Sequence, residues 1–173
     1  MHLVGGFRGY DADGDEGNET SPGDRIMDAV SYPGFSIPQY QTTLSGDLNA
    51  NGRDNEDSYH VVWVAGGEVT VDGVYITGGN ANAYTMDVPR GPSHGDVGGG
   101  IRVEDESDFV LVLTRCFLHG NYGDVGTAVG HGGFGASDLA IEGALIVDEC
   151  VVDGNISRTI QGSFKEKCAA VGV

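Results

Sequence analysis

Three segments of the chain share one pattern of apolar and polar positions. They align without gaps and read VTVDGVYITGGNA from Val69, LVLTRCFLHGNYG from Leu111 and LIVDECVVDGNIS from Leu145. Each segment begins with a short apolar stretch, turns at a two-residue polar corner, continues as a second apolar stretch and stops at Gly-Gly or Gly-Asn. Self-similarity of this kind indicates a repeat architecture.

Period-2 alternation assigns the two faces of each segment. The rows that we expect to point inward are Val69/Leu111/Leu145, Val71/Leu113/Val147, Val74/Cys116/Cys150 and Ile76/Leu118/Val152. One copy is too small to bury its apolar face alone, so the copies should stack as parallel strands about 4.8 Å apart.

A glycine-led or aromatic-led strand belongs to each copy and precedes or follows it. These strands are YHVVWV from Tyr59, GGGIRV from Gly98 and GTAVGH from Gly126. Three short strands per turn predict an all-β parallel β-helix of about three full coils with partial coils at the N-terminal end. The 30 glycines argue against a helical bundle.

The length of 173 residues fits one domain. We expect a single β-helix domain over residues 1–157 and a C-terminal tail over 158–173. The tail carries no further repeat, so the last coil leaves a strand edge that must be capped, covered or paired with another chain. A homo-oligomer formed through this C-terminal coil edge is therefore one expectation.

Further short stretches give the chain a family likeness. They are TTLSGDLN from Thr42, YHVV from Tyr59, DGVYITGGNA from Asp72, GGGI from Gly98, and Cys-x-x-x-Gly-Asn from Cys116 and Cys150. With these stretches the chain resembles right-handed parallel β-helix repeat proteins of bacterial surfaces, within the wider pectate-lyase-like fold. The resemblance implies a right-handed solenoid. Because such proteins include adhesins, autotransporter-like passengers, polysaccharide lyases and hydrolases, it leaves the activity open.

The net charge of the chain indicates which classes of partner it can bind. Nine basic and 26 acidic residues give a formal net charge of −17, which disfavours nucleic acid and anionic membrane surfaces and favours cations, calcium above all. No apolar stretch approaches the roughly 20 residues that span a bilayer. The start MHLVGGFRGY lacks the pattern of a signal peptide, yet the calcium-binding surface reading predicts a secreted or cell-surface protein.

Residues 47–58, called the acidic loop from here on, resemble the calcium loop of EF-hand and dockerin modules. Its oxygen-bearing positions one, three, five and nine are Asp47, Asn49, Asn51 and Asn55. Gly52 falls at position six, where such loops turn sharply. The end departs from the pattern, because position twelve is Ser58, Asp57 comes one residue early and a strand follows. The loop is interpreted either as a calcium site or as an acidic turn between coils.

A second acidic cluster lies near the N-terminus. It packs five carboxylates into residues 11–19, and its candidate calcium ligands are Asp11, Asp13 and Asp15. These carboxylates would repel one another at low salt without a counterion. Two clusters in one acidic chain strengthen the prediction of bound calcium.

A catalytic group would be sought on an outward face. If the stacking is right, His119 and Asp153 are neighbours across coils, and the carboxylate could orient the imidazole as a general base. Arg115 and Glu149 pair similarly at the corner. The alternative is a set of cross-strand charge pairs on a solvated face.

Two insertions interrupt the coil rhythm, and long loops on a rigid scaffold tend to carry binding function. The first spans residues 80–97, and its candidate ligand-binding residues are Tyr84, Asp87, His94 and Asp96. The second begins at His131. Together they could wall a cleft for a glycan or a small-molecule ligand.

Asn121 and Asn155 occur at equivalent bends and predict a side-chain ladder that belongs to the scaffold. Cys116 and Cys150 share one inward row. Their spacing would permit a disulfide, but their parallel directions favour free thiols.

Two functions remain at this point. The first is an extracellular calcium-binding β-helix module that binds glycans or other surface partners. The second is a calcium-dependent hydrolase or lyase acting on an acidic polysaccharide or on a lactone or ester. The sequence favours the first reading, because no serine-elbow motif, zinc-type histidine pair or coil-body lysine is present.

Overall fold

The computed structural model describes residues 1–6, 41–54, 56–81, 98–104, 108–123, 127–131 and 143–157. Within these ranges the regular secondary structure consists of β-strands alone, and every strand pair is parallel. The strands form four sheets. No helix in the same ranges is long and apolar enough to cross a membrane.

The first and second sheets have four strands each. The first sheet contains, in spatial order, β1 (His2–Val4), β4 (Gly67–Asp72), β8 (Phe109–Thr114) and β12 (Gly143–Asp148). The second sheet contains β2 (Thr42–Ser45), β5 (Val74–Thr77), β9 (Phe117–His119) and β13 (Val151–Asp153).

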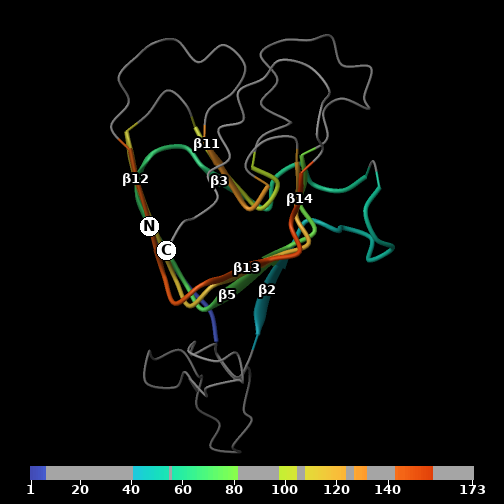
Figure 1. Cartoon of the computed structure of the whole chain (residues 1–173), viewed down its shortest axis with the longest axis horizontal. Helices are drawn as coiled ribbons and strands as arrows, with labels where there is room; N and C mark the ends of the chain where they lie inside the picture. Colours follow the sequence, from blue (N-terminus) through green and yellow to red (C-terminus); the bar gives the residue numbers. More distant parts are fainter. Residues whose placement is uncertain are drawn as a thin grey trace, which may run out of the picture.

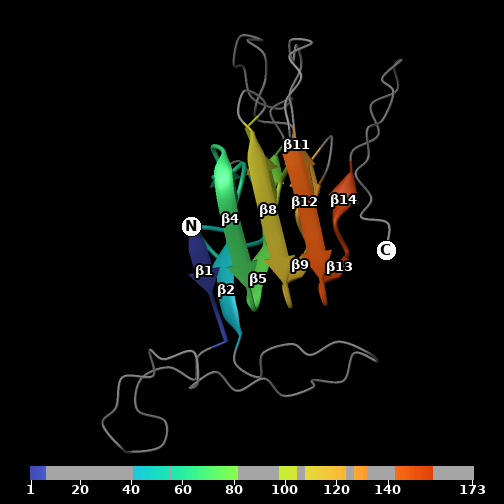
Figure 2. The same ribbon diagram turned by 90° about the vertical axis from the view of Figure 1, so that its left-hand side faces the viewer.

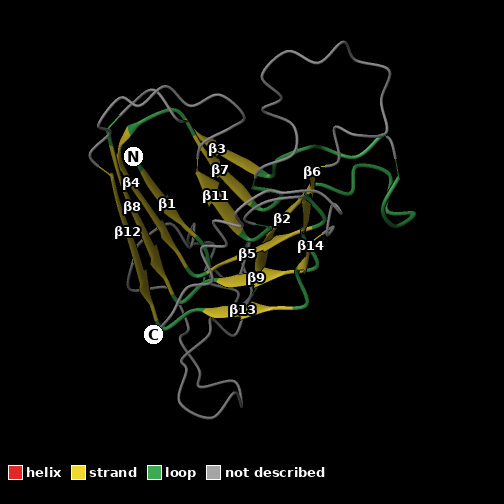
Figure 3. Ribbon diagram, turned by 45° about the horizontal axis from the view of Figure 1, so that its top comes forward, coloured by secondary structure: helices red, strands yellow, loops and turns green. Residues whose placement is uncertain are grey.

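The third and fourth sheets have three strands each. The third sheet contains β6 (Asn80–Ala81), β10 (Tyr122–Gly123) and β14 (Ile156–Ser157). The fourth sheet contains β3 (Val62–Val64), β7 (Ile101–Val103) and β11 (Val129–His131), which lie side by side in Figure 3.

The chain visits these sheets in a fixed order. β4 to β7 make one pass through the first, second, third and fourth sheets, and β8 to β11 make the next. β12 to β14 begin a third pass, and β1 to β3 supply a partial pass before the others. Successive passes lie on top of one another, so that β4, β8 and β12 run side by side (Figures 1 and 2).

The predicted inward rows are confirmed by the strand register. Val71 pairs with Leu113, and Leu113 with Val147; Ile76 pairs with Leu118. The middle pass is the most deeply packed, and its row residues are fully buried: Leu111, Leu113, Cys116 and Leu118. The core therefore lies between the sheets, where the side chains of successive passes meet.

The expected count of three strands per turn is too low, because a complete pass has four. The strand that the sequence did not predict is the short one after the bend. In each pass this strand belongs to the third sheet. Two residues are too few to show an alternation of apolar and polar positions, which explains why the sequence pattern hides β6, β10 and β14.

The corner between the first and second sheets has the same backbone conformation in the last three passes. Gly73, Arg115 and Glu149 occupy it with φ of 70°, 52° and 49°. Glycine adopts this left-handed region freely, whereas a residue with a Cβ does so at a cost of about 1 to 2 kcal/mol. The two later passes thus keep the corner despite that cost.

The asparagine ladder is confirmed at the bend between the second and third sheets. The Asn121 side chain is fully buried. It accepts a hydrogen bond from the Gly79 N–H (3.1 Å) and donates to the Ile76 carbonyl and to Asn155 Oδ1 (3.0 Å each). Asn155 in turn donates to the Leu118 carbonyl (2.8 Å).

Cys116 and Cys150 are free thiols, as the parallel directions of their side chains predict. The Cys116 backbone N–H donates to Cys150 Sγ at 3.2 Å. A hydrogen bond to Cys116, together with burial, raises the pKa of the Cys150 thiol above its ordinary value. Both side chains act as core residues in this row.

The last described pass is open on one side. Its inward residue Val152 is 44% exposed, whereas Leu118 at the same row position in the middle pass is fully buried. Ile146 and Ile156 are also exposed. The tail over 158–173 lies outside the described residues.

Candidate functional site: the acidic loop

The acidic loop joins the end of β2 to the segment that leads into β3, and backbone hydrogen bonds close its base. The Gly46 N–H donates to the Thr77 carbonyl at 2.9 Å, and the Ser58 N–H donates to the Gly46 carbonyl at 2.9 Å. The Asn80 N–H donates to the Ser58 carbonyl at 2.8 Å. The loop is therefore fixed to the bend that precedes β6.

The turn inside the loop follows the calcium-loop pattern. Gly52 at position six has φ of 86°, and its N–H donates to Asp47 Oδ2 at 3.0 Å. A side chain with a Cβ would be strained at this φ, so the glycine is required by the turn itself.

Asp54 is the internal centre of the loop, a role that the sequence pattern did not suggest. Its Oδ2 accepts hydrogen bonds from the amides of Asn51 (2.8 Å) and Asn49 (3.1 Å), and its Oδ1 accepts one from the Glu56 N–H (2.7 Å). These hydrogen bonds hold the pKa of the Asp54 carboxyl below its ordinary value. The Asp54 carboxylate is thereby committed to shaping the loop.

Three acceptor oxygens at this loop are buried and receive no hydrogen bond. They are Oδ1 of Asp47, Oδ1 of Asp57 and Oδ1 of Asn80. The side chains of Asp57 and Asn80 are only 9% and 6% exposed. A buried oxygen without a partner is costly, so each such group needs an explanation.

The predicted calcium ligands differ in whether their oxygens are already used in hydrogen bonds within the loop. Asp47 and Asp57 keep a buried oxygen free of protein donors, whereas Asn49 and Asn51 use their amides to hold Asp54. Asn55 lies outside the described residues, as do Asp11, Asp13 and Asp15 of the second acidic cluster.

The oxygen chemistry of the loop fits a hard cation. Among the described residues, no group of three or more His, Cys, Asp or Glu side chains is placed to hold a metal ion. Calcium also takes amide and backbone carbonyl oxygens. Two carboxylates with an asparagine amide are therefore compatible with that finding.

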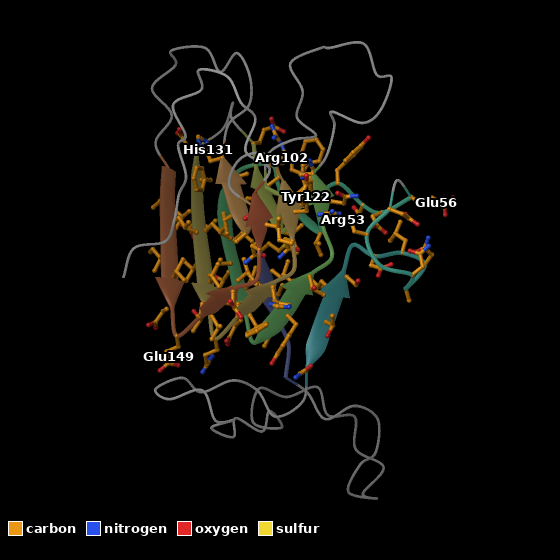
Figure 4. The ribbon with its side chains drawn as sticks, turned by 45° about the vertical axis from the view of Figure 1, so that its right-hand side comes forward. Arg53, Glu56, Arg102, Tyr122, His131 and Glu149 are labelled. Atoms are coloured by element: carbon orange, nitrogen blue, oxygen red, sulfur yellow. The ribbon has the colours of Figure 1, made fainter. Side chains whose placement is uncertain are left out.

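The loop also packs against the third sheet. The Arg53 guanidinium lies over the ring of Tyr122 in β10, with 4.0 Å between the guanidinium carbon and the ring centre. In Figure 4 these two side chains lie together, while Glu56 lies at the outer end of the loop. Cation–π contacts of this kind stabilise by about 0.5 to 1 kcal/mol at exposed sites.

The predicted catalytic neighbours His119 and Asp153 are paired in register between β9 and β13. The structure describes no hydrogen bond or ion pair between their side chains. The His119 ring instead lies 5.6 Å from the ring of Phe117 and directly against Gly154, where an added Cβ would come within 2.5 Å of it. This is a packed outward row without a formed acid–base pair.

At the corner, the hydrogen-bonded partner of Arg115 is Asp72 of the preceding pass. Arg115 Nε donates to Asp72 Oδ1 at 2.8 Å, and a second bond joins Arg115 Nη2 to Asp72 Oδ2. This pairing raises the pKa of Arg115 above its ordinary value. The charge of Glu149 also raises the pKa of Arg115, so the two expected neighbours interact electrostatically while the hydrogen bonds of Arg115 go to Asp72.

A second exposed feature of the described residues is an aromatic side chain in β3. The Trp63 side chain in β3 is 57% exposed, and its indole N–H donates to Glu104 at 3.1 Å. The His60 ring meets it edge-on at 6.0 Å. The candidate ligand-binding residues Tyr84, Asp87, His94 and Asp96 lie outside the described residues.

Comparison with known proteins adds no relative. The chain matches no protein-family model, no curated protein and no solved structure. Function must therefore be argued from the site.

Proposed function

We propose that this protein is an extracellular calcium-binding module, built on a short right-handed parallel β-helix, that binds glycans or other surface partners. The observation that carries the calcium assignment is the set of buried, unpartnered oxygens at the acidic loop. Oxygen ligands of this type, two of them from carboxylates, are those that calcium prefers in proteins.

The β-helix part of the proposal is supported by the order in which the chain visits the four sheets. Successive passes repeat the same order and keep one register. Connections between parallel strands of one sheet are right-handed in nearly all proteins, which favours a right-handed coil here.

Calcium would be held by Asp47 and Asp57 within the loop. When bound, the ion would supply positive charge to a chain whose formal net charge is −17, and it would relieve the repulsion between neighbouring carboxylates. The residues of the chain do the rest: Gly52 makes the turn, and Asp54 holds the loop together.

The glycan part of the proposal is supported by the exposed Trp63. Trp63 is more than half exposed, and its N–H is held by Glu104, so it offers an apolar ring beside polar groups, which suits a sugar ring. Tyr84, Asp87, His94 and Asp96 remain proposed contacts for the same ligand.

No described contact between the candidate catalytic side chains supports a catalytic function. His119 and Asp153 are neighbours in the stack but are not hydrogen-bonded to each other, and the His119 ring packs on Phe117 and Gly154. We therefore retain the binding function and not the hydrolase or lyase.

Calcium binding is tested by thermal unfolding in metal-free buffer at constant ionic strength. Calcium at about 100 times its dissociation constant should add about 2.7 kcal/mol, which raises Tm by roughly 5 to 10 °C for a chain of this size. Magnesium should raise Tm less. The matched variant Asp57→Asn should lose most of the calcium effect, while Glu56→Gln should keep it. An equal response to calcium and magnesium would contradict a calcium site.

Glycan binding can be followed through fluorescence, because Trp63 is the single tryptophan of the chain. A saturable change on titration with one member of a panel of acidic and neutral oligosaccharides is expected. Loss of retention of Trp63→Ala, but not of Tyr75→Ala, in an affinity gel containing that glycan would place the contact at Trp63. A flat fluorescence response together with unretarded migration of the wild type would rule out the glycans tested.

A further inference from the structure

We propose that Asn80, which lies in β6 and not in the acidic loop, binds the calcium ion directly through its Oδ1 atom. The ion would then join the loop to the coil. This inference rests on the proposed calcium site and names one of its ligands and its coupling to the fold.

The orientation of the Asn80 amide is fixed by its contacts. Its Nδ2 donates to the Asp54 carbonyl at 2.6 Å, so the nitrogen must face the loop backbone. The Oδ1 atom of the same amide then faces elsewhere, is buried and receives no hydrogen bond. With 6% of the residue exposed, solvent cannot satisfy that oxygen freely.

Asp57 presents the same arrangement from the loop side. Its Oδ2 accepts a hydrogen bond from the Asp54 N–H at 2.7 Å, while its Oδ1 is buried and unpartnered. Asn80 and Asp57 thus hold the carbonyl and the N–H of one residue, Asp54. Both side chains are therefore anchored to the same residue of the loop.

Asp47 approaches the same place through the backbone. A methyl group added at Gly78 would lie 2.9 Å from the Asp47 nitrogen and 3.2 Å from its Cβ, so Asp47 lies against the bend two residues before Asn80. Its Oδ1 is the third buried oxygen without a donor. Asp47, Asp57 and Asn80 are thus tied to one bend through the backbone contacts of Gly78 and Ser58, and each keeps an acceptor without a donor, which favours a cation.

The coil itself does not require an asparagine at position 80. The residues paired with it in the third sheet are Tyr122, and beyond that Ile156, neither of which carries an amide. The Asn80 side chain instead contacts the acidic loop, whose Arg53 lies over Tyr122 of the same row. The coil ladder of amides uses Asn121 and Asn155 at a different position.

The test begins with the wild-type protein titrated with calcium chloride alone in a calorimeter. Stoichiometric binding is required; its absence would overturn the calcium proposal and this inference together. Given binding, Asn80→Ala should weaken calcium affinity by at least about tenfold, since even residues that only support metal ligands cost that much. Asn80→Asp should keep more affinity than Asn80→Ala, because both variants lose the hydrogen bond to the Asp54 carbonyl but only Asn80→Asp keeps an oxygen and adds charge.

The matched control is Arg53→Ala, which loosens the loop from Tyr122 without removing an oxygen ligand. Its affinity should stay within about threefold of the wild type. Wild-type affinity in Asn80→Ala would overturn the role of Asn80 while leaving the calcium site standing.

A second measurement needs no destabilising change. In a nitrogen-15 NMR spectrum of the wild type, the Asn80 side-chain amide signals, assigned by their loss in Asn80→Asp, should shift on calcium addition. Unchanged Asn80 signals at saturating calcium would contradict direct ligation.

Discussion

At the scale of single residues, the molecule uses amides for two separate purposes. Asn121 and Asn155 satisfy backbone groups at the bends, and each finds its partners within the stack. The Asn80 Nδ2 donates to the backbone of the loop, and its Oδ1 has no hydrogen-bond partner. The same residue type is therefore structural in one row and a proposed ligand in another.

The structural role predicts a large effect of Asn121→Ala. Removing this buried amide takes away the acceptor of the Gly79 N–H and one donor to the Ile76 carbonyl, which should lower the free energy of unfolding by about 2 to 4 kcal/mol. Urea denaturation followed by circular dichroism measures the change. Asn155→Ala is the control, because it lies in the half-open last pass and should cost less. Equal losses for the two variants would contradict a ladder whose strength depends on burial.

At the scale of strands, much of the fold could be predicted from the sequence, because the inward rows follow period-2 alternation. The register of Val71 with Leu113 and of Ile76 with Leu118 follows directly from the aligned copies. The two-residue strands of the third sheet could not be predicted this way.

The site was only partly accessible from the sequence. Asp47, Gly52 and Asp57 follow from the spacing of the loop. Asn80 was missed because it joins the loop through long-range contacts that no local spacing encodes. Its one signal is that an asparagine replaces the apolar or aromatic residue found at that position in the other copies.

The alternation predicts opposite outcomes for two adjacent residues of β8. Leu113→Asp should unfold the protein, because Leu113 is 1% exposed and an unpaired buried charge is prohibitive. The Val112 side chain points outward, so Val112→Asp should lower the free energy of unfolding by about 1 kcal/mol, which is within the range of β-propensity differences. Thermal unfolding of the two variants distinguishes the faces, and a folded Leu113→Asp protein would disprove the register.

At the scale of the whole molecule, the two ends of the stack differ from its middle. The middle pass is covered on both sides, whereas β12, β13 and β14 have a described neighbour on one side only. Two apolar residues of that end, Val152 and Ile156, are exposed. Open parallel edges with apolar side chains tend to associate.

We therefore expect concentration-dependent self-association through this end. Sedimentation velocity over a wide concentration range should detect it, and the double variant Val152→Lys/Ile156→Lys should shift the protein toward monomer, because like charges would face each other. Trp63→Lys, at the opposite side of the stack, should leave association unchanged. A wild-type protein that is monomeric at every concentration would refute the expectation.

The pass-on-pass arrangement also has a mechanical consequence. Within the described strands, each pass pairs with the passes directly above and below it, so load applied at the C-terminal end falls first on the strands β12 to β14. Under tension the chain should peel away one turn at a time, and the resistance should rise when the fully packed middle turn is reached. An ion bound between the acidic loop and β6 would cross-link two passes near the N-terminal end. The force needed to unfold the stack from that end would then exceed the force needed from the C-terminal end.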